Sequence, residues 1–323
     1  MSETSKPVLW LTRKLSDKTE QRAQASFEVI LNVGDIPPSA DEIISMSENV
    51  DAILPCHSEV FTREVVEQLN PRVRIVANHS VGTDHCDLEA FGSRGIVVTN
   101  TPDVLSDATA EIAMMLLLGA ARRAAEGDRM LREGRWDSWS PSFMVGKQVT
   151  GKRLGIVGMG KVGQVVARRA RGFDMEVHYF NRTRLDADRE AGSIYHDNLD
   201  SLLGVSDFLS LHCPATDSTR NLINADNIAK MPRGSVLVNT SRGALVNESD
   251  FLDAIKSGHL AAAGLDCFQT EPGGNPAFAE HENIFMSPHI GSANFETRDA
   301  MGFRALDNLD AFFDGKEPGD RVA

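Results

Sequence analysis

Short apolar runs alternate with amphipathic stretches along most of the chain. In its first third, the runs predicted as strands are residues 8–12, 52–54, 73–77 and 96–100. Residues 62–69 lie between two of these runs and have helical spacing of their apolar side chains. Strands that alternate with helices are typical of α/β folds built on parallel sheets. The pattern therefore predicts an α/β architecture.

A longer apolar helix is predicted after a turn-like break at residues 100–103. Ser106 is its predicted N-cap, and Asp107 and Glu111 place carboxylates in the early turns, where the helix dipole favours them. Its apolar part, residues 112–121, is far shorter than the ~20 residues that span a bilayer. The segment is therefore predicted to be a buried helix.

A second series of alternating strands and helices begins near Lys152 and continues to about Met286. Residues 296–315 then have helical spacing again. A length of 323 residues agrees with about two domains. We therefore predict two α/β units, each with a parallel sheet.

Composition and charge narrow the class of protein. Hydrophobic residues make up 41% of the chain and charged residues 24%, the balance of a globular protein with a sizeable core. The formal net charge is -13 and no long basic run occurs, which disfavours nucleic acid and anionic membranes as partners. A small anionic substrate stays compatible, because a local pocket charge can oppose the global one.

Cysteine usage and the N-terminus indicate a cytoplasmic protein. The four cysteines, Cys56, Cys86, Cys213 and Cys267, lack the spacing of a zinc site and are interpreted as reduced thiols. Residues 1–6 are polar and carry no apolar signal segment. The motifs of a metal-binding H-E-x-x-H helix and a G-x-S-x-G nucleophile elbow are absent, and the chemistry inferred below needs no metal.

The strongest local motif is a glycine-rich loop between the apolar run 154–157 and the helical stretch 164–171. It reads Gly158-Met159-Gly160-Lys161-Val162-Gly163. Strand, loop and helix in this order are the context of a dinucleotide-binding fingerprint. The first glycine makes a tight turn, the second lets backbone N–H groups approach the pyrophosphate, and the third lets helix and strand pack closely. The helix N-terminus then faces the phosphates.

Two other interpretations of this loop stay open. Gly155, Gly160 and Lys161 are also in register with a P-loop, but Val162 stands where that loop needs a hydroxyl for Mg²⁺. The other alternative is a glycine-rich turn without any ligand. The missing hydroxyl favours the dinucleotide interpretation.

The turn after the next predicted strand, residues 176–180, bears on the choice of cofactor. NAD sites usually place a carboxylate at the end of this strand to bind the ribose hydroxyls. This chain has Asn181, Arg182, Thr183 and Arg184 there. Two arginines and a hydroxyl suit a 2′-phosphate, so the hypothesis is a preference for NADP(H), with NAD(H) as the alternative. A solvated basic turn is the simpler explanation.

Polar residues follow three further predicted strands, where ligands bind in parallel α/β sheets. Arg242 follows residues 236–238, Asp266 follows residues 261–265, and His289 follows residues 283–286. Glu271 comes five residues after Asp266, in a loop rich in proline and glycine. An arginine can hold a substrate carboxylate and polarise a carbonyl, a histidine can donate a proton, and a carboxylate can orient the histidine. The set suits the reduction of a keto acid.

Together these motifs resemble the D-isomer-specific 2-hydroxyacid dehydrogenases over nearly the whole chain. The residues that carry the resemblance lie in segments 81–84, 100–105, 107–111, 158–163, 211–214, 239–243, 264–266 and 287–292. The resemblance implies that Arg242 binds the keto acid, that His289 is the acid/base and that Glu271 is hydrogen-bonded to it. It also implies that the backbone of Val81 and Gly82 holds the substrate carboxylate.

The resemblance further implies a division of labour between two domains, with the active site in the cleft between them. Residues 1–103 and 290–323 would bind substrate, and residues 104–289 would bind the dinucleotide in a Rossmann fold. Asp266 would contact the nicotinamide carboxamide. Other implied cofactor positions, besides the loop 158–163 and the turn at Asn181, Arg182 and Thr183, are Thr109, Cys213, Thr240, Ser241 and Gly291.

Within the family, the chain is most similar to glyoxylate/hydroxypyruvate reductases, through the turn 181–184 and the paired tryptophans of segment 134–139. These imply an NADPH-dependent reduction of glyoxylate or hydroxypyruvate to a D-2-hydroxy acid by a homodimer. Trp139 is the candidate for reaching a partner's pocket, and a plain interface aromatic is the alternative. His57 and Ser58 occupy a substrate-side loop in relatives, but are interpreted as solvated loop residues.

Other functions of the same family stay open. One is the oxidation of a different acid, such as 3-phosphoglycerate, D-lactate or phosphite, with NAD as cofactor. Another is a cofactor-sensing corepressor that binds partner proteins, although such relatives carry long disordered tails that this chain lacks. The sequence does not decide the physiological substrate or the direction of the reaction.

Overall fold

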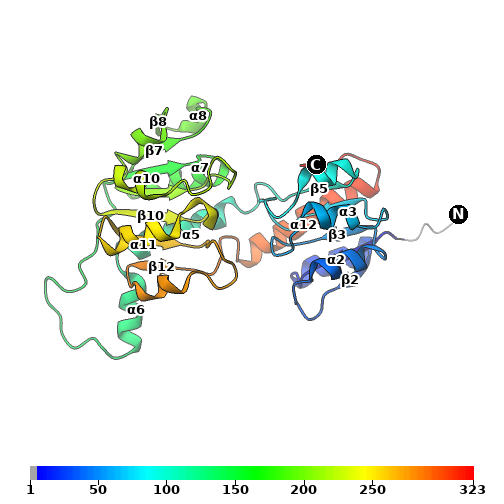
Figure 1. Cartoon of the computed structure of the whole chain (residues 1–323), viewed down its shortest axis with the longest axis horizontal. Helices are drawn as coiled ribbons and strands as arrows, with labels where there is room; N and C mark the ends of the chain where they lie inside the picture. Colours follow the sequence, from blue (N-terminus) through cyan, green and yellow to red (C-terminus); the bar gives the residue numbers. More distant parts are fainter. Residues whose placement is uncertain (1–5) are drawn as a thin grey trace. The chain divides into compact units, whose positions relative to one another are not determined.

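The computed structural model describes residues 6–323, so most of the segment that we examined for a signal, residues 1–6, lies outside it. The chain divides into two compact units (Figure 1). Unit 1 holds Met1–Leu105 and Ser292–Ala323, and unit 2 holds Ser106–Gly291. Among the described residues, no helix is long and apolar enough to cross a membrane. Each unit is described by itself.

Unit 1 is a five-stranded parallel sheet with the strand order β2-β1-β3-β4-β5. This is the order of doubly wound, flavodoxin-like folds, in which the chain reverses direction across the sheet next to the first strand. Its strands are β1 (Val8–Leu11), β2 (Glu28–Leu31), β3 (Ala52–Leu54), β4 (Ile75–Ala77) and β5 (Val97–Thr99). Its helices are α1 (Asp17–Ser26), α2 (Ala40–Ser47), α3 (Arg63–Gln68), α4 (Leu88–Ser93) and α12 (Phe295–Phe313).

The core of unit 1 follows from the alternation of side chains along β1. Leu9 and Leu11 face one side, where they pack with Ala305 of α12 and Ala23 of α1. Trp10 faces the other side, where the cluster includes residues of α2, α3 and α4. Although α12 comes from the C-terminal end, Figure 1 shows it against the strands of unit 1. Both faces of the sheet are therefore covered by helices.

Unit 2 is a seven-stranded parallel sheet with the strand order β12-β11-β10-β9-β6-β7-β8. The order is that of a Rossmann fold with a seventh strand. Strands β7 and β8 are added on one side of β6 and strands β9 to β12 on the other, so the strand order reverses between β6 and β9. Its strands are β6 (Arg153–Val157), β7 (Glu176–Phe180), β8 (Ile194–His196), β9 (Phe208–Leu211), β10 (Ser235–Asn239), β11 (Leu260–Leu265) and β12 (Ile284–Met286). Its helices are α5 (Ser106–Ala121), α6 (Ala124–Arg132), α7 (Lys161–Arg171), α8 (Ala187–Glu190), α9 (Leu199–Leu203), α10 (Ala225–Lys230) and α11 (Glu248–Lys256).

Helix α5 crosses the face of this sheet at very short range. An ideal Cβ atom on Gly264 of β11 would lie 2.7 Å from Cβ of Leu116, and one on Gly119 would overlap the ring of Phe285. These glycines let the apolar helix lie directly on β11 and β12. The helix predicted to be buried is therefore buried against the sheet of its own unit.

Several sequence predictions need correction. Ser106 is the first residue of α5 and not the cap that precedes it. Helix α7 begins at Lys161, three residues before the predicted start, so Gly160 becomes its N-cap. The strands β2 and β8 were not predicted: both are short, partly exposed edge strands, β8 lacks a continuous apolar run, and the apolar run 29–31 of β2 was not recognised as a strand.

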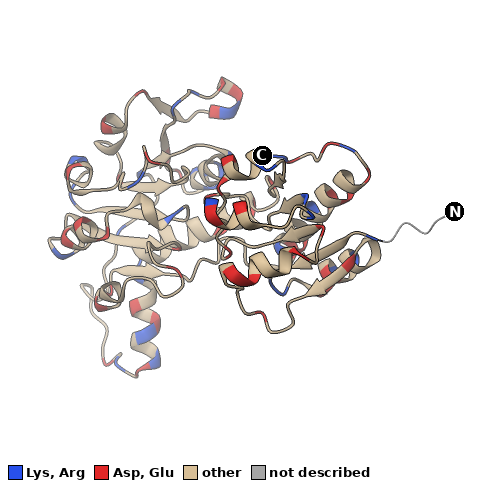
Figure 2. Cartoon of the chain, turned by 45° about the vertical axis from the view of Figure 1, so that its right-hand side comes forward, with Lys and Arg blue, Asp and Glu red and all other residues tan. Residues whose placement is uncertain are grey.

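Charged residues are distributed over the outer helices and loops of both units. In Figure 2, acidic and basic residues are interspersed along these elements, with both signs on α6. The four cysteines form no disulfide with one another. The surface drawn in Figure 2 thus carries mixed charge.

Candidate active site

The glycine-rich loop joins β6 to α7, and packing alone demands two of its glycines. Gly158 has φ +90°, and an ideal Cβ atom there would lie 2.5 Å from the backbone nitrogen of Cys213. An ideal Cβ on Gly163 would lie 2.6 Å from the carbonyl oxygen of Gly158. Both distances are shorter than real side chains tolerate. The loop is therefore held tightly between β6 and the segment that follows β9.

Gly160 is different, because the fold itself does not require a glycine there. An ideal Cβ on Gly160 would meet no atom within 4 Å, and its φ is negative. Gly160 is the N-cap of α7, without a side-chain cap and without an acidic residue in the first turn. Uncapped amides at a helix N-terminus, next to open space, fit an incoming phosphate group.

The turn after β7 is tied to this loop. The backbone nitrogen of Met159 donates to Oδ1 of Asn181 at 2.7 Å. Arg182 and Thr183 are exposed, whereas Arg184 forms a bidentate ion pair with Glu190 at 2.7 and 3.1 Å. The two arginines that the sequence presents as equivalent therefore have different surroundings. No sequence signal indicated that Glu190 would engage one of them.

The segment after β9 lies where the strand order reverses. The ring of His212 hydrogen-bonds Oγ of Ser210 at 2.8 Å and Oγ1 of Thr240 at 3.5 Å. Burial lowers the pKa of His212 to about 4, so this ring is neutral near pH 7. Burial also raises the pKa of the Cys213 thiol to about 11, and the carbonyl of Cys213 accepts a hydrogen bond from Oγ of Ser241. His212 had entered the sequence analysis only as part of a family motif.

Arg242 follows β10 and is positioned by the last residue of that strand. Nδ2 of Asn239 donates to the carbonyl oxygen of Arg242 at 2.8 Å, and Oδ1 of Asn239 accepts from the backbone of Ser241 at 3.0 Å. Nη1 of Arg242 donates to the carbonyl oxygen of Ser241 at 2.8 Å. A buried asparagine therefore shapes the turn that carries the arginine.

Glu271 and His289 form a direct pair. Oε2 of Glu271 lies 2.6 Å from Nδ1 of His289, and Oε1 of Glu271 accepts from the backbone of Phe268 at 2.8 Å. Their side chains are 27% and 28% exposed, so solvent-sized molecules can reach them. Since Nδ1 faces the carboxylate, proton exchange between His289 and another molecule would go through Nε2.

The loops of Arg242 and Glu271 touch through a glycine. An ideal Cβ atom on Gly243 would lie 1.9 Å from the carbonyl carbon of Phe268. Only glycine allows the backbones to approach this closely. The arginine turn therefore packs directly on the loop whose carboxylate holds His289.

Asp266 ends β11 and has one carboxylate oxygen without a partner. Oδ1 accepts from Oγ of Ser287 at 2.6 Å and from the backbone of Ile290 at 2.9 Å. Oδ2 is buried and has no hydrogen bond to any described residue. An ideal Cβ on Gly291 would lie 3.3 Å from this Oδ2 and 3.4 Å from Oγ1 of Thr109. A buried unsatisfied acceptor fits a ligand that brings an N–H donor, such as a carboxamide.

The expected substrate loop belongs to unit 1 and follows β4. Oγ of Ser80 donates to the carbonyl oxygen of Gly82 at 2.8 Å, and Nδ2 of Asn100 donates to that of Val81 at 2.9 Å. Both carbonyls are therefore fixed by side chains. Ser58, interpreted as a solvated loop residue, is exposed and accepts a hydrogen bond from Arg13 at 2.8 Å.

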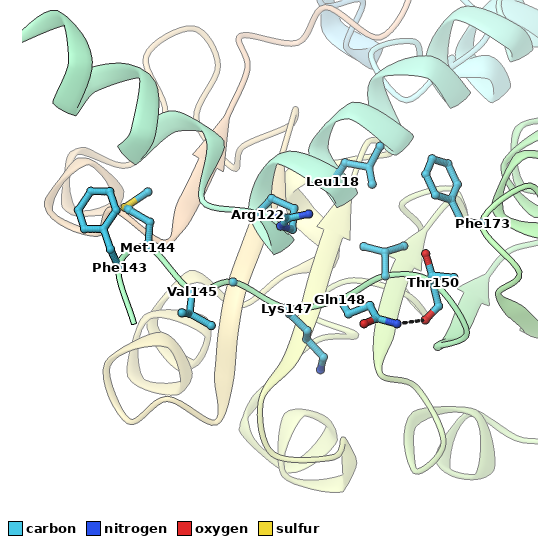
Figure 3. Close-up of a pocket in the computed structure, with 11 residues that line it drawn as sticks. Leu118, Arg122, Phe143, Met144, Val145, Lys147, Gln148, Thr150 and Phe173 are labelled. Atoms are coloured by element: carbon cyan, nitrogen blue, oxygen red, sulfur yellow. Dashed lines mark hydrogen bonds between the residues drawn. The ribbon is translucent and has the colours of Figure 1, made fainter. Parts of the chain in front are cut away.

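Trp139 lies on the segment that follows α6, which extends away from the sheet of unit 2 (Figure 1). It is 72% exposed, so its indole is not packed into a site within its own chain. A cavity of about 510 Å³ lies beside the end of this segment, between Leu118 of α5, Arg122 just after that helix, residues 143–150 and Phe173 (Figure 3). None of the predicted site residues lines it.

Comparisons with known proteins agree with this picture. A model of the D-isomer specific 2-hydroxyacid dehydrogenase NAD binding domain matches residues 114–291. A glycerate dehydrogenase from Hyphomicrobium methylovorum is 42% identical over 97% of this chain and 98% of its own length. A glyoxylate reductase from Korarchaeum cryptofilum is 41% identical over 98% of this chain and 96% of its own.

A solved structure of an NADPH-dependent glyoxylate/hydroxypyruvate reductase from Sinorhizobium meliloti, in complex with NADP and malonate, is also similar. It has a TM-score of 0.87 and 32% identity, and the match covers 99% of this chain and 97% of that one. The resemblance inferred from the sequence motifs is therefore confirmed, as is the α/β fold with two parallel sheets. The chain belongs to the D-isomer-specific 2-hydroxyacid dehydrogenases and is an oxidoreductase of that family with an NAD(P)-binding domain.

Proposed function

We propose that the protein is an NADPH-preferring reductase that converts glyoxylate or hydroxypyruvate to the corresponding 2-hydroxy acid, with D configuration where a stereocentre forms. The observation that carries the proposal is the Glu271–His289 pair beside the loop of Arg242. The names of the similar proteins support the substrate class: glyoxylate reductase, and glycerate dehydrogenase, whose named acid is the product of hydroxypyruvate reduction.

The proposed chemistry follows from these three side chains. The guanidinium of Arg242, whose charge is permanent, binds the substrate carboxylate and polarises the neighbouring carbonyl. Glu271 accepts the Nδ1 proton of His289 in a hydrogen bond, which fixes the ring and stabilises its protonated form. Nε2 of His289 then gives a proton to the carbonyl oxygen. The nicotinamide cofactor supplies the hydride that adds to the carbonyl carbon.

The cofactor contacts are proposed from unit 2. The uncapped start of α7 behind Gly160 would bind the pyrophosphate, and the unsatisfied oxygen of Asp266 would accept from the carboxamide. Thr109, Cys213, Thr240, Ser241 and Gly291 complete the proposed set. Arg182 and Thr183 would bind the 2′-phosphate, because they follow β7 and no carboxylate stands at Asn181 to repel it.

Two further parts of the proposal concern the substrate and a second copy. The backbone amides of Val81 and Gly82 would bind the substrate carboxylate, which makes unit 1 the substrate-binding domain. A homodimer is supported by apolar side chains that the end of α6 and the segment after it leave exposed, since large exposed apolar patches mark interaction sites. These are Leu131, Trp136, Trp139, Phe143 and Val145.

The first experiment is a set of initial rates for NADPH and NADH oxidation with glyoxylate, hydroxypyruvate and pyruvate. We expect kcat/KM of about 10⁴ M⁻¹s⁻¹ or above with NADPH and one of the first two acids. NADH as the better cofactor would reject the NADP preference and leave the reaction class intact. No turnover with any 2-keto acid, by a preparation that binds NADPH, would reject the proposed substrates.

A further inference from the structure

Three side chains next to the turn 181–185 bind one another, and we call them the Tyr179 cluster. They are Tyr179 of β7, Arg184 of the turn itself and Glu190 at the end of α8. The hydroxyl of Tyr179 donates to Oε1 of Glu190 at 2.6 Å. Nε of Arg184 donates to the same oxygen at 2.7 Å, and its Nη2 donates to Oε2 at 3.1 Å. Both carboxylate oxygens are therefore occupied.

The cluster is built into the fold. Tyr179 is fully buried and the side chain of Glu190 is 10% exposed. The carbonyl of Glu190 accepts from Nη2 of Arg171 at 3.1 Å, which ties α8 to α7. The side chain of Arg184 is 63% exposed, but the carboxylate that it binds is nearly buried and would be poorly solvated without it, so the ion pair is expected to persist in solution.

The same cluster fixes one end of the turn. The hydroxyl of Tyr179 accepts from the backbone nitrogen of Leu185 at 3.1 Å, while Asn181 holds the other end by accepting from Met159. Arg182 and Thr183 lie between these two anchors, exposed and without a hydrogen bond or ion pair to any described residue. The turn is thus held on both sides of two side-chain donors that have no partner among residues 6–323.

We propose that the Tyr179 cluster is a positioning device for cofactor specificity: it holds the turn so that Arg182 and Thr183 meet the 2′-phosphate of NADP(H), and Arg184 itself does not bind that phosphate. This inference rests on the NADP part of the proposed function. The positive charge of Arg184 is already matched by Glu190, and both of its bonded nitrogens point to that carboxylate. The unmatched cation of the turn is Arg182.

The rival explanation is that Glu190 merely withholds a second phosphate ligand. The two explanations predict opposite effects of Glu190→Gln. If Arg184 is a ligand held back by Glu190, the variant frees its charge and strengthens binding of a 2′-phosphate. If the cluster positions the turn, the variant loosens the turn and weakens that binding.

The test is isothermal titration calorimetry with 2′,5′-ADP and 5′-ADP, which differ only in the 2′-phosphate and carry no nicotinamide. The readout is the ratio of the two dissociation constants within one variant, so a partly unfolded preparation does not distort it. Arg182→Ala should lower the preference for 2′,5′-ADP over 5′-ADP about tenfold or more, because a charge-assisted hydrogen bond to the 2′-phosphate is lost. Tyr179→Phe and Glu190→Gln should each lower it roughly three- to tenfold by the loss of a positioning hydrogen bond, with 5′-ADP affinity unchanged.

Arg189→Ala is the matched control, because it removes an exposed arginine of α8 one residue from Glu190 and should leave the ratio unchanged. A wild-type protein that does not prefer 2′,5′-ADP would overturn the NADP proposal itself. A wild-type preference that Arg182→Ala removes, but that Tyr179→Phe and Glu190→Gln leave intact or increase, would overturn only the positioning role. Loss of preference in all three variants supports it.

Discussion

Glu271 and His289 come from loops after two neighbouring strands, and their side chains meet at 2.6 Å through Oε2 and Nδ1. The backbone of His289 is in the left-handed region, with φ +52°, which a residue other than glycine rarely adopts. Such a conformation persists only where the surrounding structure imposes it, and it is frequent at functional sites. The imposed geometry directs the ring of His289 to the carboxylate.

We expect His289→Ala to lower kcat/KM for keto-acid reduction at least ~10²-fold, because the proton donor is lost. Glu271→Gln keeps a hydrogen-bond acceptor for Nδ1 of His289 but removes the negative charge beside the ring, so its effect should be smaller than that of His289→Ala. Steady-state rates across pH 5.5–9 would measure both. Reduction at near wild-type rates by His289→Ala at every pH would remove the residue from the mechanism.

Arg242→Ala should raise KM and lower kcat together, because the same fork holds the carboxylate and polarises the carbonyl. Arg242→Lys is the matched comparison, since lysine keeps the charge and loses the bidentate geometry. The lysine variant should recover part of the affinity and little of kcat. An Arg242→Ala enzyme with unchanged kcat/KM would contradict the proposed role.

The first two glycines of the loop should respond differently to alanine. Gly158→Ala places a Cβ 2.5 Å from the Cys213 backbone at a positive φ, so it should destabilise unit 2 with or without cofactor. Gly160→Ala meets no atom within 4 Å and should melt like the wild type, yet bind NADPH at least tenfold more weakly. Thermal melting and NADPH fluorescence titration separate the two effects. Wild-type NADPH affinity in Gly160→Ala would argue against the pyrophosphate at this position.

Unit 1 should lose stability on mild acidification because of His79, which is 4% exposed. Burial lowers the pKa of His79 to about 4, below the ~6.5 of an unfolded chain. Between these values the unfolded chain binds a proton that the folded state does not, so stability falls as the pH drops through this window. Linkage gives a loss of about 2 kcal/mol between pH 7 and pH 5.

Trp10 can report this unfolding, because it is buried in unit 1, whereas Trp136 and Trp139 are exposed on unit 2. Urea denaturation of a Trp136→Phe/Trp139→Phe background, with and without His79→Gln, would measure the effect. Between pH 7 and pH 5, the free energy of unfolding of the glutamine variant should fall by about 2 kcal/mol less than that of the protein with His79. Equal pH dependence in both proteins would assign the acid sensitivity to other groups.

How far the sequence predicts this structure depends on the range of the interactions involved. The strands that end at Arg242, Asp266 and His289 were predicted from local apolar runs, and parallel pairing then brings their carboxyl ends to one edge of the sheet. Glu271 was a candidate only through its place five residues after Asp266, since a glutamate in a loop has no periodicity to place it, and its hydrogen bond to His289 was implied by the family resemblance. The chain divides between its two compact units after Leu105 and after Gly291.

Contacts between distant side chains could not be predicted in the same way. Arg184 is indistinguishable from Arg182 in the sequence, and only the packing of α8 brings Glu190 to one of them. The edge strand β8 lacks a continuous apolar run, and the run 29–31 of the edge strand β2 is only partly buried. These two segments become strands because a neighbouring strand offers them backbone hydrogen bonds, and their own residues do not reveal which strand that is.

The two ends of the chain build a single core: Leu9 and Leu11, near the start, pack against Ala305 and Leu306 of α12. On a ribosome, unit 2 is a contiguous segment and is complete before α12 has been translated. Unit 1 can close only after release of the last residues, so its nascent sheet keeps one apolar face uncovered for most of translation. A message that ends shortly after unit 2 would therefore yield a chain whose first third never completes its core.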